Sequence, residues 1–106
     1  MINSAVNENM GNIYLKQGAK LTISGQGTLN LIVNKFFGIY GEDSSSFEMN
    51  GGILKIISTE NSVGGIHIND DIQFNNPSFY YEDISGEKPV VSTNQSIVIN
   101  SGNFNI

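Results

Sequence analysis

The sequence contains no cysteine, no tryptophan and no arginine, and it has only one histidine and two prolines. The absence of cysteine excludes a disulfide framework and a thiolate metal site, and a single histidine excludes a metal site with several imidazole ligands. Five lysines stand against ten acidic residues, and the net charge of −5 disfavours binding to nucleic acid or to an anionic membrane surface. No apolar run exceeds three residues, so no segment is expected to span a bilayer.

The first twelve residues, MINSAVNENMGN, are polar and lack the basic region and the hydrophobic stretch of a signal peptide. The protein is therefore either cytoplasmic or an exported protein whose leader is absent from this chain. The length of 106 residues predicts one domain with a hydrophobic core of its own.

The clearest pattern is FEMNGGILKII, which starts at Phe47 and ends at Ile57. Apolar and polar residues alternate on both sides of Gly51-Gly52, which is typical of two half-buried strands joined by a sharp turn. The pattern returns from Ile72 and, after an equal step, from Ile97, and an earlier copy from Leu21 has a slightly longer turn. A fixed repeat of this kind predicts a solenoid of stacked coils.

Each coil contains a third strand, predicted at Ile13–Leu15, Gly38–Tyr40, Gly65–Ile68 and Pro89–Val91. The two connections that flank this strand vary in length, but a longer one is always offset by a shorter one, as required if each coil lies over the one below. For the last coil the pattern places Val90 opposite Ile66. We predict about four coils of about 25 residues each, with residues 1–12 as a cap or partial coil and residues 13–106 as the solenoid domain.

Sixteen positions, four in each coil, are predicted to point into the core, and all of them are apolar or tyrosine. They are Leu21, Ile23, Leu29, Leu31, Phe47, Met49, Leu54, Ile56, Ile72, Phe74, Phe79, Tyr81, Ile97, Ile99, Phe104 and Ile106. One further column, Ser24, Asn50, Asn75 and Asn100, is predicted to form a hydrogen-bonded ladder at a coil corner.

The segments LTISGQGTLNL (21–31), FEMNGGILKI (47–56) and GGIHINDDIQF (64–74) resemble the repeats of a bacterial carbohydrate-binding domain family. The resemblance covers the chain from about Lys20 to Ile106. It implies a right-handed parallel β-helix of the pectate-lyase-like type, an extracellular or cell-surface location, and binding of polysaccharide, often cellulose or acidic sugars. It also implies bound calcium.

Two acidic pairs could supply calcium ligands. Asp70 and Asp71 precede the strand that starts at Ile72, where the resemblance implies a calcium-binding corner, and Glu42 and Asp43 occupy the corresponding connection one coil earlier. Calcium prefers six to eight oxygen ligands, including carboxylates and carbonyls. The alternative is that these acids are solvated turn residues.

Tyr14, Tyr40 and His67 occupy outward positions of the third strand in three successive coils. Because coils stack about 4.8 Å apart, the three rings are expected to form a stripe, with Lys16 and Asn69 beside it as further carbohydrate-binding candidates. Such a stripe could bind the apolar faces of sugar rings, or its rings could simply stack on one another and protect the sheet. Of the preceding pair, we expect one of Phe36 and Phe37 to cover the core and the other to extend the stripe.

The sequence does not favour an enzyme. A β-helix lyase typically uses arginine as its base, and a glycosidase needs two carboxyl groups facing each other across a cleft, whereas the neighbours Asp70 and Asp71 point to opposite sides of an extended chain. We predict a non-catalytic polysaccharide-binding module. The alternative is a structural or adhesive β-solenoid segment without a small-molecule ligand.

The chain stops at Ile106, inside a predicted strand. The apolar side chains of Ile97, Ile99, Phe104 and Ile106 would then be uncovered on one side, and uncovered strand edges recruit another chain. We expect either an end-to-end homodimer through this coil, closed head to head by a two-fold axis, or excision from a longer solenoid.

Overall fold

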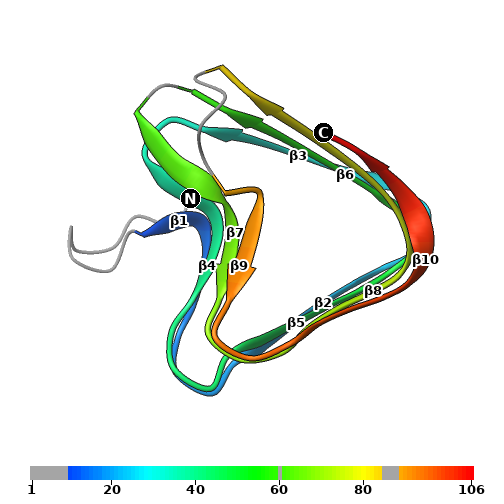
Figure 1. Cartoon of the computed structure of the whole chain (residues 1–106), viewed down its shortest axis with the longest axis horizontal. Helices are drawn as coiled ribbons and strands as arrows, with labels where there is room; N and C mark the ends of the chain where they lie inside the picture. Colours follow the sequence, from blue (N-terminus) through cyan, green and yellow to red (C-terminus); the bar gives the residue numbers. More distant parts are fainter. Residues whose placement is uncertain (1–9, 60, 85–88) are drawn as a thin grey trace.

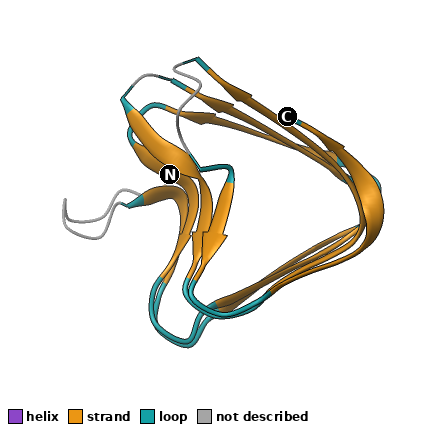
Figure 2. Cartoon of the chain, in the orientation of Figure 1, coloured by secondary structure: helices purple, strands orange, loops and turns teal. Residues whose placement is uncertain are grey.

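The computed structural model describes residues 10–59, 61–84 and 89–106, and ten β-strands account for most of these residues (Figure 2). The described part of the chain has no helix long and apolar enough to cross a membrane. The strands are β1 (Gly11–Leu15), β2 (Lys20–Ser24), β3 (Thr28–Val33), β4 (Phe36–Gly41), β5 (Ser46–Asn50), β6 (Ile53–Ser58), β7 (Ser62–Ile68), β8 (Ile72–Asp83), β9 (Val91–Thr93) and β10 (Ile97–Asn105).

The chain winds into a stack of coils with a three-sided outline (Figure 1). One side is a parallel sheet in the order β1-β4-β7-β9, and the other two sides form a bent sheet in the order β2-β5-β8-β6-β3, with β10 paired to β8. Each strand therefore pairs with its equivalent in the next coil rather than with its neighbour in sequence. This arrangement confirms the predicted parallel β-solenoid of about four coils.

The bend between the two sides of the second sheet follows the predicted glycine corner. β5 and β6 are separated there by Gly51-Gly52, whereas β8 runs through the corner without interruption. Gly51, Gly52 and Asn76 have φ angles of 89°, 80° and 58°, which glycine adopts freely and asparagine tolerates better than most residues. The corner therefore depends on these residue types.

Three of the four predicted members, Asn50, Asn75 and Asn100, form a ladder at this corner, whereas the Ser24 side chain forms no hydrogen bond with a described residue. Asn75 Nδ2 donates to Asn50 Oδ1 at 2.6 Å, and Asn100 Nδ2 donates to Asn75 Oδ1 at 2.6 Å. In both bonds the amide nitrogen points toward the N-terminal end of the stack and the oxygen accepts from the C-terminal side. The ladder therefore has a direction along the solenoid axis.

The predicted position of the last third strand is wrong by one residue. Ile66 pairs with Val91, not with Val90, and β9 starts at Val91. The connections on either side of this strand then have the same lengths as those of the coil below, because pairing with β7 fixes the position of the strand. Of the predicted cap at residues 1–12, residues 1–9 lie outside the described part of the chain, and β1 starts at Gly11.

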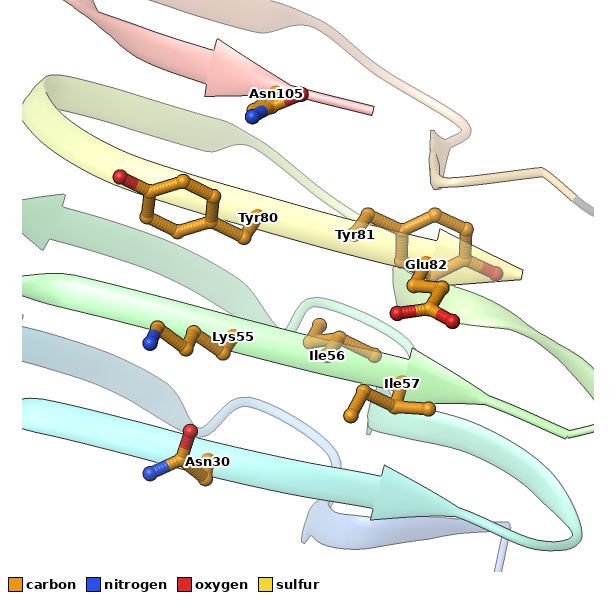
Figure 3. Close-up of a pocket in the computed structure, with 8 residues that line it drawn as sticks. All are labelled: Asn30, Lys55, Ile56, Ile57, Tyr80, Tyr81, Glu82 and Asn105. Carbon is orange, nitrogen blue, oxygen red and sulfur yellow. The ribbon is translucent and has the colours of Figure 1, made fainter. Parts of the chain in front are cut away.

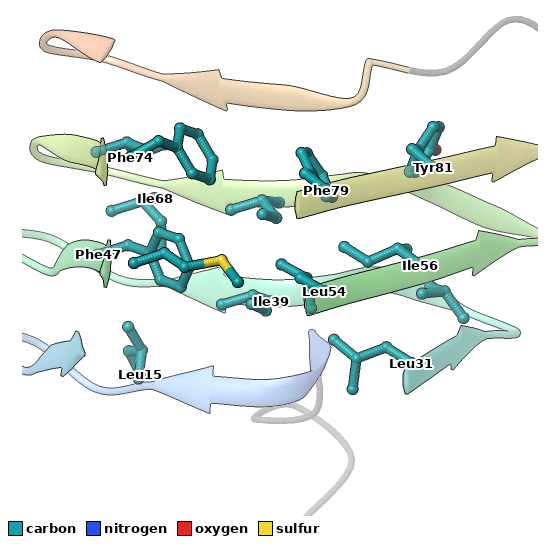
Figure 4. Packing of buried hydrophobic residues seen from close by; sticks show 14 residues of the cluster. Leu15, Leu31, Ile39, Phe47, Leu54, Ile56, Ile68, Phe74, Phe79 and Tyr81 are labelled. Atoms are coloured by element: carbon teal, nitrogen blue, oxygen red, sulfur yellow. The ribbon is translucent and has the colours of Figure 1, made fainter. Parts of the chain in front are cut away.

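The core is a set of apolar columns along the stack. Figure 4 shows Leu31, Ile56 and Tyr81 one above the other, with Leu54 below Phe79 in the next column. All eight inward residues of the second and third coils are buried, whereas Ile97, Ile99 and Ile106 of the last coil are exposed. The predicted columns are therefore correct in direction, but the last coil is not buried, because within the described residues β10 pairs only with β8.

Candidate functional site

Tyr14, Tyr40 and His67 form a continuous stack of rings on the outer face of the β1-β4-β7 side. The ring centroids of Tyr14 and Tyr40 lie 5.9 Å apart with their planes 12° from parallel, and those of Tyr40 and His67 lie 5.4 Å apart at 25°. The strand register sets Tyr14 directly opposite Tyr40, and Tyr40 directly opposite His67. The predicted stripe is therefore present, and each of its rings is partly exposed.

Phe37 joins this stripe, with its ring centroid 5.6 Å from that of Tyr40 and 5.5 Å from that of His67. The expectation that one residue of the phenylalanine pair covers the core is wrong, since neither belongs to the buried cluster. Phe36 has a φ of 62°, and the register shifts between the two residues. This irregularity breaks the alternation that would have turned one ring inward, and Lys35 Nζ lies 5.6 Å from the centre of the Phe36 ring.

Two of the three stripe residues, Tyr14 and His67, have a polar group paired within the protein, whereas the Tyr40 hydroxyl forms no hydrogen bond with a described residue. The Tyr14 hydroxyl donates to Glu42, whose other carboxylate oxygen accepts from the Gln17 backbone N–H at 3.1 Å. His67 Nδ1 lies 2.8 Å from the Ser92 hydroxyl. Burial lowers the pKa of His67, because the charged imidazolium loses hydration there.

A row of polar side chains follows the stripe at the ends of the same strands. Asn69 Nδ2 donates to Asp43 Oδ1 at 3.0 Å, and Asn94 Nδ2 donates to Asn69. Our sequence reasoning missed this second ladder, although the spacing of its three members matches the coil repeat. Asn69 therefore holds neighbouring coils together, rather than presenting a free amide beside the rings.

The stripe is consequently a poor surface for face-on contact with a sugar. Stacking of a sugar on an aromatic ring needs an open ring face, but within this stack the faces of Tyr14, Tyr40 and His67 lie against one another. Lys16 is exposed and forms no ion pair with a described residue. Next to Lys16 in the sequence, Gln17 lines a polar hollow of about 370 Å³ together with Glu42 and Asp43.

The acidic residues predicted to bind calcium are held by hydrogen bonds at the coil corners. Asp71 Oδ1 accepts from the Ser96 hydroxyl at 2.9 Å, and the Asp70 backbone N–H donates to the Ser45 carbonyl at 2.9 Å. Glu42 and Asp43 accept the bonds described above. In residues 10–59, 61–84 and 89–106, no three His, Asp or Glu side chains come together as a metal-binding group. The calcium site stays a prediction.

A second surface lies on the outside of the β3, β6 and β8 strands, where a groove of about 500 Å³ crosses several coils. Figure 3 shows the Lys55 and Tyr80 side chains extending in the same direction from neighbouring strands, and Ile57 and Glu82 side by side further along the same strands. The groove is lined by Asn30, Lys55, Ile56, Ile57, Tyr80, Tyr81, Glu82 and Asn105.

The outer groove contains polar side chains that form no hydrogen bond or ion pair with described residues. Lys55 Nζ lies 5.7 Å from the centre of the Tyr80 ring, a cation–π contact, and Lys55 forms no ion pair with a described residue. Tyr80 is 39% exposed and stacks on no other described ring. The side chains of Asn30 and Asn105 form no hydrogen bonds within the described part of the chain.

The sequence contains a signal for this groove, since Asn30, Lys55, Tyr80 and Asn105 follow one another at equal intervals of one coil. Our sequence reasoning did not identify the column as a site, because spacing alone does not tell which polar groups the fold already uses.

Comparison with known proteins gives no relative: no family model, no curated protein and no solved structure matches this chain. The fold and the two surfaces therefore carry the functional inference.

Proposed function

We propose that this protein is a non-catalytic polysaccharide-binding module of a secreted or cell-surface protein, and that the outer groove is its binding surface. The observation that carries the proposal is the Tyr80 ring, which is 39% exposed, stacks on no other described ring and has the Lys55 ammonium 5.7 Å from its centre and Asn105 on the next coil. Sugar rings have an apolar C–H face and polar edges, so they suit a partly exposed aromatic ring surrounded by hydrogen-bonding groups.

The direction of the groove also supports a chain-like ligand. Asn30, Lys55, Tyr80 and Asn105 lie on four successive coils, about 4.8 Å apart. A polysaccharide that runs along the solenoid axis would contact a new side chain at each coil. The sequence resemblance to a bacterial carbohydrate-binding family with a parallel β-helix fold supports the same class of ligand.

The second candidate function is a structural or adhesive solenoid segment without a small ligand. The hydrogen bonds in and beside the stripe favour it, because Tyr14, His67 and Asn69 are paired within the protein. The two functions differ in one measurable property, which is the retention of the protein on polysaccharide.

The test is a binding assay on cellulose and on soluble acidic and neutral polysaccharides with Tyr80→Ala and Tyr40→Ala, a matched pair of ring deletions. We expect Tyr80→Ala to weaken binding about three- to tenfold, the range expected for one aromatic contact, and Tyr40→Ala to leave it unchanged. Because Tyr80 is exposed, its replacement should not change the melting temperature.

Two outcomes would contradict the proposal in different ways. Weaker binding with Tyr40→Ala alone would move the site to the stripe and keep the function. Absence of binding by the parent protein to every polysaccharide would eliminate the module and leave the structural solenoid.

A further inference from the structure

The corner between β5 and β6 contains Asn50-Gly51, the only asparagine–glycine sequence in the chain. Asparagine is one of the chemically labile residues, and a following glycine has no side chain to shield its backbone nitrogen. At the other corners of the ladder column the pairs are Ser24-Gly25, Asn75-Asn76 and Asn100-Ser101. The conditions for deamidation therefore coincide at one corner of the solenoid.

Deamidation of this pair joins the Gly51 backbone nitrogen to Asn50 Cγ. The nitrogen loses its proton, the bond between Cγ and Nδ2 breaks, and Nδ2 leaves as ammonia together with that proton. The cyclic imide then takes up a water molecule from the solvent and opens either to aspartate or to isoaspartate, in which the backbone runs through the former side chain. Both reacting groups must therefore be free to approach each other.

In the folded protein the next coil holds both reacting groups. The Gly51 N–H donates to the Asn75 carbonyl at 3.0 Å, and Asn50 Oδ1 accepts from Asn75 Nδ2 at 2.6 Å. Loss of the Gly51 proton breaks the first bond, and rotation of Asn50 Cγ toward the backbone breaks the second. A single residue of the adjacent coil, Asn75, therefore opposes both movements that the reaction needs.

We propose that Asn50 is the site of spontaneous deamidation in this protein, and that Asn75 controls the rate because the reaction requires local opening of the corner. This inference does not depend on the polysaccharide proposal. Isoaspartate would lengthen the backbone between Asn50, which is in register with Asn75, and Ile53, which is in register with Ser78. A corner that has reacted in this way cannot return to its original register.

The first test compares the parent protein in neutral buffer with the same protein unfolded in urea. Mass spectrometry of the peptide that contains Asn50 measures deamidation over time, and isoaspartate is detected in the same peptide. We expect Asn50 to react first among the asparagines of the unfolded chain, and at least about tenfold more slowly in the folded protein. Equal rates in the two states, or faster reaction of another asparagine in urea, would overturn the proposal.

The second test uses two matched variants of the ladder. Asn75→Asp keeps the shape of the side chain but removes the amide donor to Asn50, whereas Asn100→Asp makes the same change one coil away and removes only the donor to Asn75. We expect Asn75→Asp to accelerate deamidation of folded Asn50 about three- to tenfold, the factor that corresponds to one hydrogen bond. Asn100→Asp should react at the rate of the parent, and equal acceleration by both variants would overturn the proposal.

A third variant separates local opening from a general loss of stability. Ile66→Val shortens a buried side chain in β7, which belongs to the other sheet, and it should lower the stability of the fold without touching the corner. Urea unfolding measures how far Ile66→Val and Asn75→Asp each destabilise the protein. We expect Ile66→Val to leave the rate at Asn50 unchanged. Acceleration as strong as that of Asn75→Asp would show reaction through global unfolding and overturn the proposal.

Discussion

Strands β8 and β10 have nearly the same pattern of apolar residues, but the structure gives them different environments. Ile72 and Phe74 in β8 are 0% and 1% exposed, whereas Ile97 and Ile99, their register partners in β10, are 42% and 56% exposed. The difference comes from the neighbours, because β8 is paired on both edges and β10 on one. In Figure 4 every labelled side chain belongs to a coil below the last one.

This comparison shows that burial in a solenoid belongs to the stack and not to the single coil. Each coil contributes half of an interface, and a column becomes a core only when a second coil covers it. The contribution of a residue to the stability of the fold therefore depends on which coil it belongs to as much as on its side chain.

The largest expected effect on stability comes from replacing register partners in β8 and β10. Phe74→Ala should lower the free energy of unfolding by about 3–5 kcal/mol, because it leaves a cavity next to Phe47 and Phe79. Ile99→Ala, its register partner, should cost less than about 1 kcal/mol, since more than half of its side chain is already hydrated. Urea unfolding of dilute protein measures both, and equal losses would show that the last coil is covered.

A smaller effect on the free energy of unfolding is expected from the Tyr81 hydroxyl, which is buried because another coil covers the coil that contains it. The Tyr81 hydroxyl is buried without a hydrogen-bond partner among the described residues. Burial raises the pKa of this hydroxyl, and the nearby Ser58 side chain partly offsets the increase. The two side chains do not form a hydrogen bond of normal geometry. Tyr81→Phe should therefore be neutral or stabilise the protein by up to about 1 kcal/mol. Thermal unfolding measures the change, and a loss above about 1 kcal/mol would reveal a partner for this hydroxyl.

The smallest expected effect concerns pH. The pKa of His67 is lowered by burial in the folded protein, so below the unfolded value of about 6.5 the unfolded chain binds a proton that the folded chain resists. The free energy of unfolding should be constant above that pH, fall as the pH decreases from about 6.5 to the lowered folded pKa, and then level off. His67→Gln should remove this component. A parent and variant with the same pH dependence between about pH 7.5 and 5.5 would show that His67 is fully hydrated.

Most of the fold could be predicted because its signals are local and repeated. Alternation around Gly51-Gly52 gave the inward columns, and equal spacing gave the ring stripe and the asparagine ladder. The position of β9 could not be predicted from spacing alone, because the connection before it absorbs a one-residue difference. The prediction for Phe36 and Phe37 failed for a related reason. The positive φ of Phe36 interrupts the alternation of inward and outward side chains, and nothing in the sequence indicates this interruption.

The candidate site was harder to predict than the fold. The stripe residues Tyr14, Tyr40 and His67 were correctly placed together, but the sequence did not show that their ring faces lie against one another and that Tyr14 and His67 form hydrogen bonds within the protein. The groove around Lys55 and Tyr80 has the same repeat spacing, and its polar side chains form no hydrogen bonds or ion pairs with described residues. Only the packing of neighbouring coils separates the two surfaces.

By itself, the sequence determined the coil period, the inward columns and the corner residues, because alternation and glycine placement act over a few bonds. The tertiary structure decided which column members are buried, which polar groups remain free, and the direction of the amide ladders. The physical reason is that hydration and hydrogen bonding depend on the coil above and the coil below, which are a full coil away in the chain and only about 4.8 Å away in space.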